Sequence, residues 1–439
     1  MRRGVLVGVS SIFVLSMFAL FVSTAMAGDV PEIDTGDNAW MLMSAALVLF
    51  MTPGLALFYG GMVRSKNMVN TIWMSFICMC IATMTWVLWG YSLAFAPGNW
   101  FIGGLQWCGL GLGAVGQTPL EGSTIPHLTF MVFQGMFVII TTAIMSGAFV
   151  ERFKFNAWML LILLWTTIVY PPIAYWVWAD GWLGAIGKLD FAGGTVVHIC
   201  SGASALAILL VVGKRKEVRP PHNLPLMMLG TGMLWFGWFG FNAGSAGAAD
   251  GLAASAFVVT NISAAAGGLA WSILEWIYHK KPTILGACSG VVAGLVGITP
   301  CAGYVGPMAS IFVGVIAGII CFYCVTKLKP IIGYDDALDV LGIHAYGGTW
   351  GGLAVGIFAS TSVNPGGADG AIYGNFTQLG IQAIGVLVGW AWAFGITLPL
   401  ALFVNWVIGL RPSEADETIG MDQTQHKEIS YHIFEAEQT

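Results

Sequence analysis

Long apolar stretches separated by short polar loops make up most of the chain. A helix needs about 20 apolar residues to span the hydrocarbon core of a bilayer. The pattern predicts eleven such helices, over residues 39–60, 69–95, 127–149, 157–178, 195–212, 226–248, 253–277, 284–300, 306–326, 341–360 and 376–408. The eighth stretch is short and rich in glycine, and the last is long enough to tilt or to kink at Pro399. The predicted fold is an all-α polytopic membrane protein.

Composition supports this prediction and excludes a soluble domain. Hydrophobic residues make up 57% of the 439 residues and charged residues only 9%, whereas soluble domains carry about 25% charged residues. The 59 glycines are typical of membrane helices that pack closely.

The basic residues predict the orientation, because cytoplasmic loops of membrane proteins carry an excess of Lys and Arg. Leaving aside Arg2 and Arg3, 14 of the 15 basic residues fall in odd-numbered loops or in the tail, and Lys188 is the exception. The odd-numbered side is therefore expected to be the inside. This puts the amino terminus outside and the carboxyl terminus inside.

The two ends of the chain differ from the membrane region. Arg2 and Arg3 precede an apolar run that is followed by Ala25-Met26-Ala27, a pattern typical of a secretory signal peptide. We expect a signal peptide over 1–27, although an uncleaved first helix is the alternative. Residues 28–410 form the predicted membrane domain and 411–439 an acidic, polar cytoplasmic tail. The plasma membrane of a prokaryote is the expected location.

Two ionisable pairs with the same spacing interrupt the apolar pattern. Asp190 precedes His198 by eight residues, with two glycines between them, and Asp336 precedes His344 by eight residues. Eight residues of helix rise about 12 Å. The two helices run in opposite directions, so both histidines are expected near the midplane. This predicts an inverted repeat of the first five and the next five helices, with the eleventh outside the repeat.

Ionisable residues inside a membrane are costly and usually functional. We therefore expect His198 and His344 to act together rather than to serve as packing. Asp190 has two possible roles, as a fixed charge or as the cap of a helix, and both stay open. Asp335, Asp336 and Asp339 are expected to cap or anchor the tenth helix at the inner face.

Other chemistry has little support in the sequence. The eight cysteines form no framework, and a disulfide between Cys108 and Cys301, both in predicted outer loops, stays open. No nucleophile–base pair, metal-ligand cluster or cofactor motif stands out, so we expect no enzyme, no metal, no cofactor and no nucleic-acid partner. His222 lies in a basic inner loop and is expected to be solvated.

Four longer motifs carry a specific resemblance to a known family. The motifs are TPGLALFYGGMVR at 52–64, DFAGGTVVH at 190–198, GWFGFNAGSAG at 237–247, and LGACSG at 285–290 with GLVGITP at 294–300. From about residue 39 to the tail, the chain resembles the Amt branch of the Amt/Mep/Rh ammonium transporters, as found in bacteria and archaea. The resemblance implies an eleven-helix subunit, a homotrimer in membrane lipid, and one ammonium/ammonia pathway through each subunit.

The resemblance also implies roles for individual residues. An outer recruitment site for ammonium would consist of Trp178 and Ser245 together with the ring of Phe137. Phe137 and Phe241 would form a stacked gate. The remaining matched positions are the supporting residues Phe133 and Gln134, the twin pore histidines His198 and His344, and the buried Asp190, and we group Asp336 with Asp190 as a structural and electrostatic residue. Without the resemblance, Trp178 would be interpreted as an interfacial belt residue and the two phenylalanines as packing.

Physical chemistry gives these roles a reason. Cation–π contact with Trp contributes roughly 0.5–2 kcal/mol, and a hydroxyl accepts a hydrogen bond that ammonium donates and potassium cannot. A bare cation is costly between apolar walls, so deprotonation to ammonia favours passage beyond the rings. The histidines can then bind ammonia and relay the proton. Asp190 would favour a cation at the outer site.

The tail departs from the family at one position. The family usually has His-Gly-Glu where this chain has His426-Lys427-Glu428. In the family the tail packs on the inner face, couples neighbouring subunits and helps a PII-type regulatory trimer (GlnK) to dock. We therefore expect an ammonium transporter regulated from the inside. A passive ammonia gas channel of the Rh kind and an ammonium sensor are the alternatives, the second disfavoured because we expect no signalling domain after the tail.

Overall fold

The computed structural model describes residues 32–120 and 122–431, so the predicted signal peptide lies outside the described residues. The described residues from Ile33 onward form one compact unit. Its α-helices are α2 (Thr35–Met62), α3 (Met68–Thr85), α4 (Tyr91–Phe95), α5 (His127–Ser146), α6 (Phe155–Ile168), α7 (Tyr170–Trp178), α8 (Trp182–Ala185), α9 (Cys200–Val212), α10 (Leu224–Ala243), α11 (Gly251–His279), α12 (Ile284–Ile298), α13 (Pro307–Tyr323), α14 (Lys329–Ile332), α15 (Tyr346–Phe358), α16 (Phe376–Ile408) and α17 (Glu414–Ile419).

Short helices of other pitch extend or connect these elements. Five are π-helices, namely η2 (Trp86–Gly90), η4 (Gly194–Ile199), η6 (Cys324–Leu328), η7 (Leu341–Ala345) and η9 (Asp422–His426). Four are 3₁₀-helices, namely η1 (Ser65–Asn67), η3 (Cys108–Gly113), η5 (Gly244–Ala246) and η8 (Ala371–Tyr373). Single-turn π segments inside longer helices are frequent at functional sites.

All eleven predicted ranges are helical over most of their length. Among the described residues, nine helices are long and apolar enough to cross a membrane. The other two predicted spans correspond to the shorter α12, of 15 residues, and to η7 with α15. The fourth span is interrupted between α6 and α7, where two prolines occupy the first turn of α7. Proline is tolerated there because the first amides of a helix have no partner inside it.

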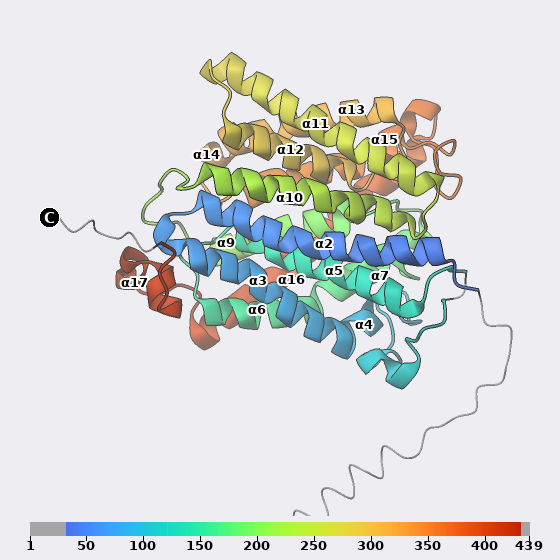
Figure 1. Ribbon diagram of the computed structural model, residues 1–439, viewed down its shortest axis with the longest axis horizontal. Helices are drawn as coiled ribbons and strands as arrows, with labels where there is room; N and C mark the ends of the chain where they lie inside the picture. Colours follow the sequence, from blue (N-terminus) through green and yellow to red (C-terminus); the bar gives the residue numbers. More distant parts are fainter. Residues whose placement is uncertain (1–31, 121, 432–439) are drawn as a thin grey trace, which may run out of the picture. The chain divides into compact units, whose positions relative to one another are not determined.

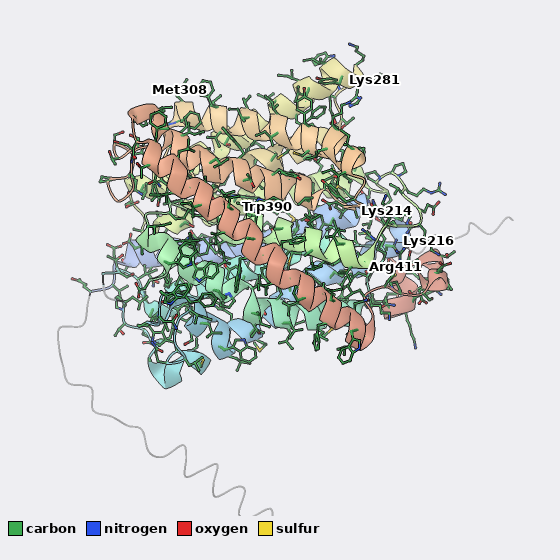
Figure 2. The ribbon with its side chains drawn as sticks, turned by 180° about the vertical axis from the view of Figure 1, so that it is seen from behind. Lys214, Lys216, Lys281, Met308, Trp390 and Arg411 are labelled. Atoms are coloured by element: carbon green, nitrogen blue, oxygen red, sulfur yellow. The ribbon has the colours of Figure 1, made fainter. Side chains whose placement is uncertain are left out.

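The long helices run side by side (Figure 1). Glycines let α2 and α10 approach closely, since a Cβ on Gly230 would lie 2.4 Å from the backbone nitrogen of Phe58. In Figure 2, α16 crosses the opposite face of the bundle diagonally. The labelled basic residues Lys214, Lys216 and Arg411 gather at one end of the helices, which is the end of α17 and the tail (Figure 2).

Candidate functional site

A chamber of about 150 Å³ lies where α5, α7 and η5 meet. Its walls include all five residues that the sequence predicts for the outer end of the pathway: Phe133, Gln134, Phe137, Trp178 and Ser245. The fold therefore brings together side chains that are more than one hundred residues apart in sequence. The chamber combines aromatic rings with a few polar atoms, as expected of a site for a small cation.

Trp178 is held in place by its own hydrogen bond. The indole Nε1 donates to the backbone oxygen of Asp190 over 2.8 Å. The indole edge meets the ring of Phe137 at 84°, with the centroids 5.6 Å apart. Because its N–H is already bonded, the indole presents only its apolar ring to the chamber.

Two polar groups of the chamber can accept hydrogen bonds. The hydroxyl of Ser245 donates to the backbone oxygen of Phe241 over 2.8 Å, which leaves its oxygen lone pairs available. Oε1 of Gln134 is buried and has no hydrogen-bond partner within residues 32–120 and 122–431. A buried acceptor without a partner is costly. A ligand with N–H groups can donate to the hydroxyl oxygen of Ser245, whereas Oε1 of Gln134 is covered and must turn towards the chamber to accept from it.

Two phenylalanine rings close the inner end of the chamber. The rings of Phe137 and Phe241 lie with their centroids 4.4 Å apart and tilted by 34°. They are 1% and 0% exposed, respectively. Phe133 packs edge-on against Phe137 at 5.0 Å. The pair is therefore a tight apolar barrier rather than an open passage.

His198 and His344 lie directly behind this barrier. Their Nδ1 atoms are 3.2 Å apart, and the His198 ring stacks on the ring of Phe241 at a centroid distance of 6.0 Å. Nε2 of His198 is buried and has no protein partner among the described residues. An Nδ1–Nδ1 contact requires one ring to donate its proton and the other to accept it. One histidine thus has Nε2 free to accept, while the other has Nε2–H free to donate.

The space around the imidazoles is narrow and apolar. The cavity that both rings line leaves only about 10 Å³ accessible to the centre of a water molecule, which is close to the minimum for one water. Most of its other lining side chains are aliphatic or aromatic, among them Ile140, Leu234 and Trp238. A neutral molecule of the size of water fits this space, whereas a hydrated cation does not.

Missing side chains explain why the two histidines meet. A Cβ on Gly202 would lie 2.6 Å from the backbone nitrogen of Ala345. A Cβ on Gly348 would lie 3.0 Å from Cβ of His198. The helices that carry the histidines can cross at this distance only because both positions are glycine.

Asp190 is a helix cap in this structure. It is 4% exposed, and its carboxylate accepts hydrogen bonds from the amides of Gly193, Gly194 and Thr195 over 3.0, 2.6 and 2.7 Å. These amides open η4, so the carboxylate satisfies groups that a helix start leaves without partners. Gly193 has φ +105° and a Cβ there would lie 3.2 Å from the Trp178 ring, so only glycine suits this turn.

Asp336 repeats part of this arrangement. Its Oδ2 accepts from the amide of Leu341 over 2.7 Å at the start of η7, as the sequence predicted. Asp339 accepts instead from Lys329 over 2.6 Å. Asp335 forms a bidentate pair with Arg215. Burial raises the pKa of Asp335, but the hydrogen bonds from Arg215 outweigh it and lower this pKa to about 2.

The described part of the tail docks at the start of α3 and on the loop before α10. Asp422 accepts from the amides of Val69 and Asn70 over 3.0 and 2.8 Å, at the start of α3. His222, predicted to be solvated, is half-buried: its Nδ1 lies 2.6 Å from the backbone oxygen of Val63 and its Nε2 lies 3.1 Å from the hydroxyl of Tyr431. Lys427 adopts φ +58°, the conformation for which glycine is favoured.

Sequence reasoning missed one buried polar cluster near the chamber. Lys188 is 4% exposed, and its Nζ donates to Oε1 of Gln382 in α16 over 2.6 Å. The signal was present in the sequence: Lys188 is the one basic residue on its side, and two glutamines four residues apart interrupt the apolar α16. Cys108 and Cys301, whose pairing was left open, are both free.

Comparison with known proteins decides the family. The sequence model of the Ammonium Transporter Family matches residues 39–431. The chain belongs to the ammonium transporter family. Together with the nine candidate membrane helices, this makes it a multi-pass membrane protein.

Relatives in bacteria and archaea cover nearly the whole chain. The ammonium transporter of Bacillus subtilis is 52% identical over 399 residues, covering 90% of this chain and 98% of that protein. The ammonium transporter Amt1 of Archaeoglobus fulgidus is 45% identical over 401 residues, covering 90% and 99%. These relatives are named as transporters, which points to a function in transport rather than in enzymatic catalysis.

Solved structures of the family have the same fold. Mep2 of Candida albicans superposes with a TM-score of 0.82 at 38% identity, covering 88% of each chain. A protein described as a sensor Amt protein superposes with a TM-score of 0.81 at 29% identity, covering 88% of this chain and 97% of that one.

Proposed function

We propose that this protein recruits ammonium in the outer chamber, deprotonates it near the phenylalanine gate, and conducts ammonia past the two histidines into the cytoplasm. The observation that carries the proposal is the direct Nδ1–Nδ1 contact of His198 and His344 immediately behind a closed aromatic barrier. A tight apolar space favours a neutral species. A shared imidazole proton supplies a route for charge.

Recruitment rests on the chamber. The face of Trp178 would attract the cation by roughly 0.5–2 kcal/mol, while Ser245 and Gln134 accept two of its N–H groups. Potassium has no proton to donate, so it forms neither of these directional hydrogen bonds. Selectivity for ammonium over potassium follows from this difference.

The proton leaves ammonium at the gate and follows the histidine pair. One imidazole takes up a proton at its free Nε2 and passes its Nδ1 proton to the neighbouring Nδ1. The second imidazole then releases a proton from its own Nε2. One proton enters the pair and one leaves it, and neutral ammonia moves separately through the apolar space.

Ammonium-evoked current in proteoliposomes tests this mechanism, measured with and without an imposed pH gradient. A double variant with His198→Ala and His344→Ala should retain its fold and lose the current. If the current of the double variant equals that of the wild type, the histidines carry no proton. If the wild type gives no current while ammonia still passes, the passive gas channel is favoured instead.

A sensor is the second candidate, because one structural neighbour is described as a sensor Amt protein. A sensor would bind ammonium without conducting it. Calorimetric binding of ammonium to the purified protein, combined with an absence of flux into proteoliposomes, would favour this function.

We also propose a homotrimer in the plasma membrane, with residues 411–439 in the cytoplasm as a regulatory tail. The docking of Asp422 on the start of α3 supports such a tail, because it couples the tail to a membrane helix. Native mass measurement tests the trimer. Binding of a PII-type protein to the full chain, and its loss in a chain ending at 410, tests the regulatory role.

A further inference from the structure

We infer that α16 positions the outer ammonium site through the buried pair of Lys188 and Gln382. This inference rests on the proposed function and adds a positioning residue to it. Lys188 does not line the chamber, so it does not touch the ion. It acts on the three-residue segment from Lys188 to Asp190 that holds the indole of Trp178.

Lys188 is an unusual buried cation. Its Nζ donates to Oε1 of Gln382 over 2.6 Å and to the backbone oxygen of Leu189 over 3.2 Å. Within the described ranges, no carboxylate lies within salt-bridge distance of it, and the carboxylate of Asp190 is bonded to backbone amides. A buried charge costs free energy unless it is well bonded. The two oxygens therefore fix the position of Nζ.

α16 is shaped to receive this side chain. A Cβ on Gly385 would lie 2.3 Å from Cε of Lys188 and 2.4 Å from its Cδ, so the lysine stem lies against bare backbone. One turn before Gln382 on α16, Nε2 of Gln378 donates to the backbone oxygen of Gly187 over 3.1 Å. Two neighbouring residues of the outer segment are thus fastened to the same helix.

The segment is fastened to the chamber at its other end. The backbone oxygen of Asp190 accepts the indole N–H of Trp178 over 2.8 Å. A displacement of residues 188–190 would therefore move the acceptor that orients the indole. The connection runs from Gln382 through Lys188 and the Asp190 backbone to Trp178.

Positioning and charge have opposite effects on ammonium binding, which makes the inference testable. Removing a nearby positive charge would lower the half-saturating ammonium concentration, because like charges repel. Loss of the indole orientation would raise it, by about fivefold if one ordinary hydrogen bond is lost. The sign of the shift in Lys188→Met therefore distinguishes the two roles.

The experiment measures ammonium-evoked current against concentration in proteoliposomes. Lys188→Met should raise the half-saturating concentration about fivefold and change the maximal current less than about twofold. In a Trp178→Phe background, which lacks the indole N–H, Lys188→Met should add almost nothing. Lys281→Met removes an exposed lysine and is the matched control with an unchanged response.

Gly385→Ala provides a second test in which the cation is retained. Its added methyl group pushes the lysine stem off α16 and should shift the half-saturating concentration in the same direction. It replaces Lys188→Met if that variant does not fold. An unchanged or lowered half-saturating concentration, or an equal effect in the Trp178→Phe background, overturns the inference. A wild type without current contradicts the proposed function instead, and calorimetric ammonium binding then provides the same comparison among the variants.

Discussion

Asp190→Asn separates the two roles that a carboxylate at this position can have. As a cap, Asp190 satisfies three backbone amides at the start of η4. As a fixed charge, it would favour a cation in the outer chamber. Asparagine is nearly isosteric but has one acceptor oxygen and no charge. It can keep the amides of Gly193 and Gly194 on that oxygen, while its NH₂ group then faces the amide of Thr195.

The magnitude follows from these three bonds. The amide of Thr195 loses its acceptor, and leaving a buried amide without a partner costs about 1–3 kcal/mol. The remaining two bonds lose the contribution of the negative charge, about 1 kcal/mol in total. We therefore expect Asp190→Asn to destabilise the protein by about 3 kcal/mol. Because His198 lies three residues after Thr195 in the same η4, the maximal current should also fall.

Thermal unfolding followed by size-exclusion chromatography measures the first effect, and proteoliposome current measures the second. Asp180→Asn is the matched control, since it removes an exposed carboxylate from the loop after α7. It should leave both quantities near the wild-type values. If Asp190→Asn unfolds like the wild type and only its half-saturating ammonium concentration rises, the charge matters and the capping argument is wrong.

Three further predictions concern the inner face and the helix crossing. Lys427→Gly should relieve about 1 kcal/mol of left-handed backbone strain and slow proteolysis of the tail; faster cleavage would contradict this. Because the pKa of Asp335 is lowered to about 2, its pair with Arg215 stabilises the fold above pH ~4 by about 1–2 kcal/mol after solvent screening, and this is lost as the pH falls towards 2. Arg215→Met should weaken that dependence in thermal unfolding curves, while Arg152 and the amide of residue 215 still lower the pKa of Asp335, and a variant with the wild-type pH profile would contradict it. Gly202→Val should separate the helices at Ala345 and abolish ammonium-evoked current, whereas full current in a folded variant would show that the crossing distance is unimportant.

The sequence was sufficient to predict the helical ranges, nine of which are candidate membrane spans among the described residues, because apolar length and the loops between are local properties. It also predicted which side chains meet in the chamber, but only through a family resemblance. Trp178 and Ser245 are separated by 66 residues, and no local pattern relates them. The same holds for Lys188 and Gln382, which are separated by 193 intervening residues. Their contact depends on how α16 crosses the bundle.

The π-helical starts of the two histidine helices could not be predicted from periodicity either. η4 contains one glycine and four β-branched residues, which lower its α-helix propensity without specifying a π-turn. The pitch of η4 and η7 follows from tertiary constraints, such as the close approach of Gly348 to His198. A wider turn changes the direction in which a side chain points. The directions of His198 in η4 and His344 in η7 therefore could not be predicted from the sequence.

The equal spacing of the two polar pairs explains the geometry of the pore centre. In each pair the aspartate accepts from the amide five residues later, at Thr195 or Leu341, and the histidine follows three residues after that amide. Both helix starts thus have the same spacing from the aspartate to the histidine. The two histidines that follow them meet through the same ring atom, Nδ1. A symmetric Nδ1–Nδ1 contact cannot hold a symmetric proton arrangement, because one nitrogen must donate and the other accept. When both histidines are neutral, the contact therefore makes them different tautomers, one with Nδ1–H and one with Nε2–H, and a proton can pass along the Nδ1–Nδ1 contact.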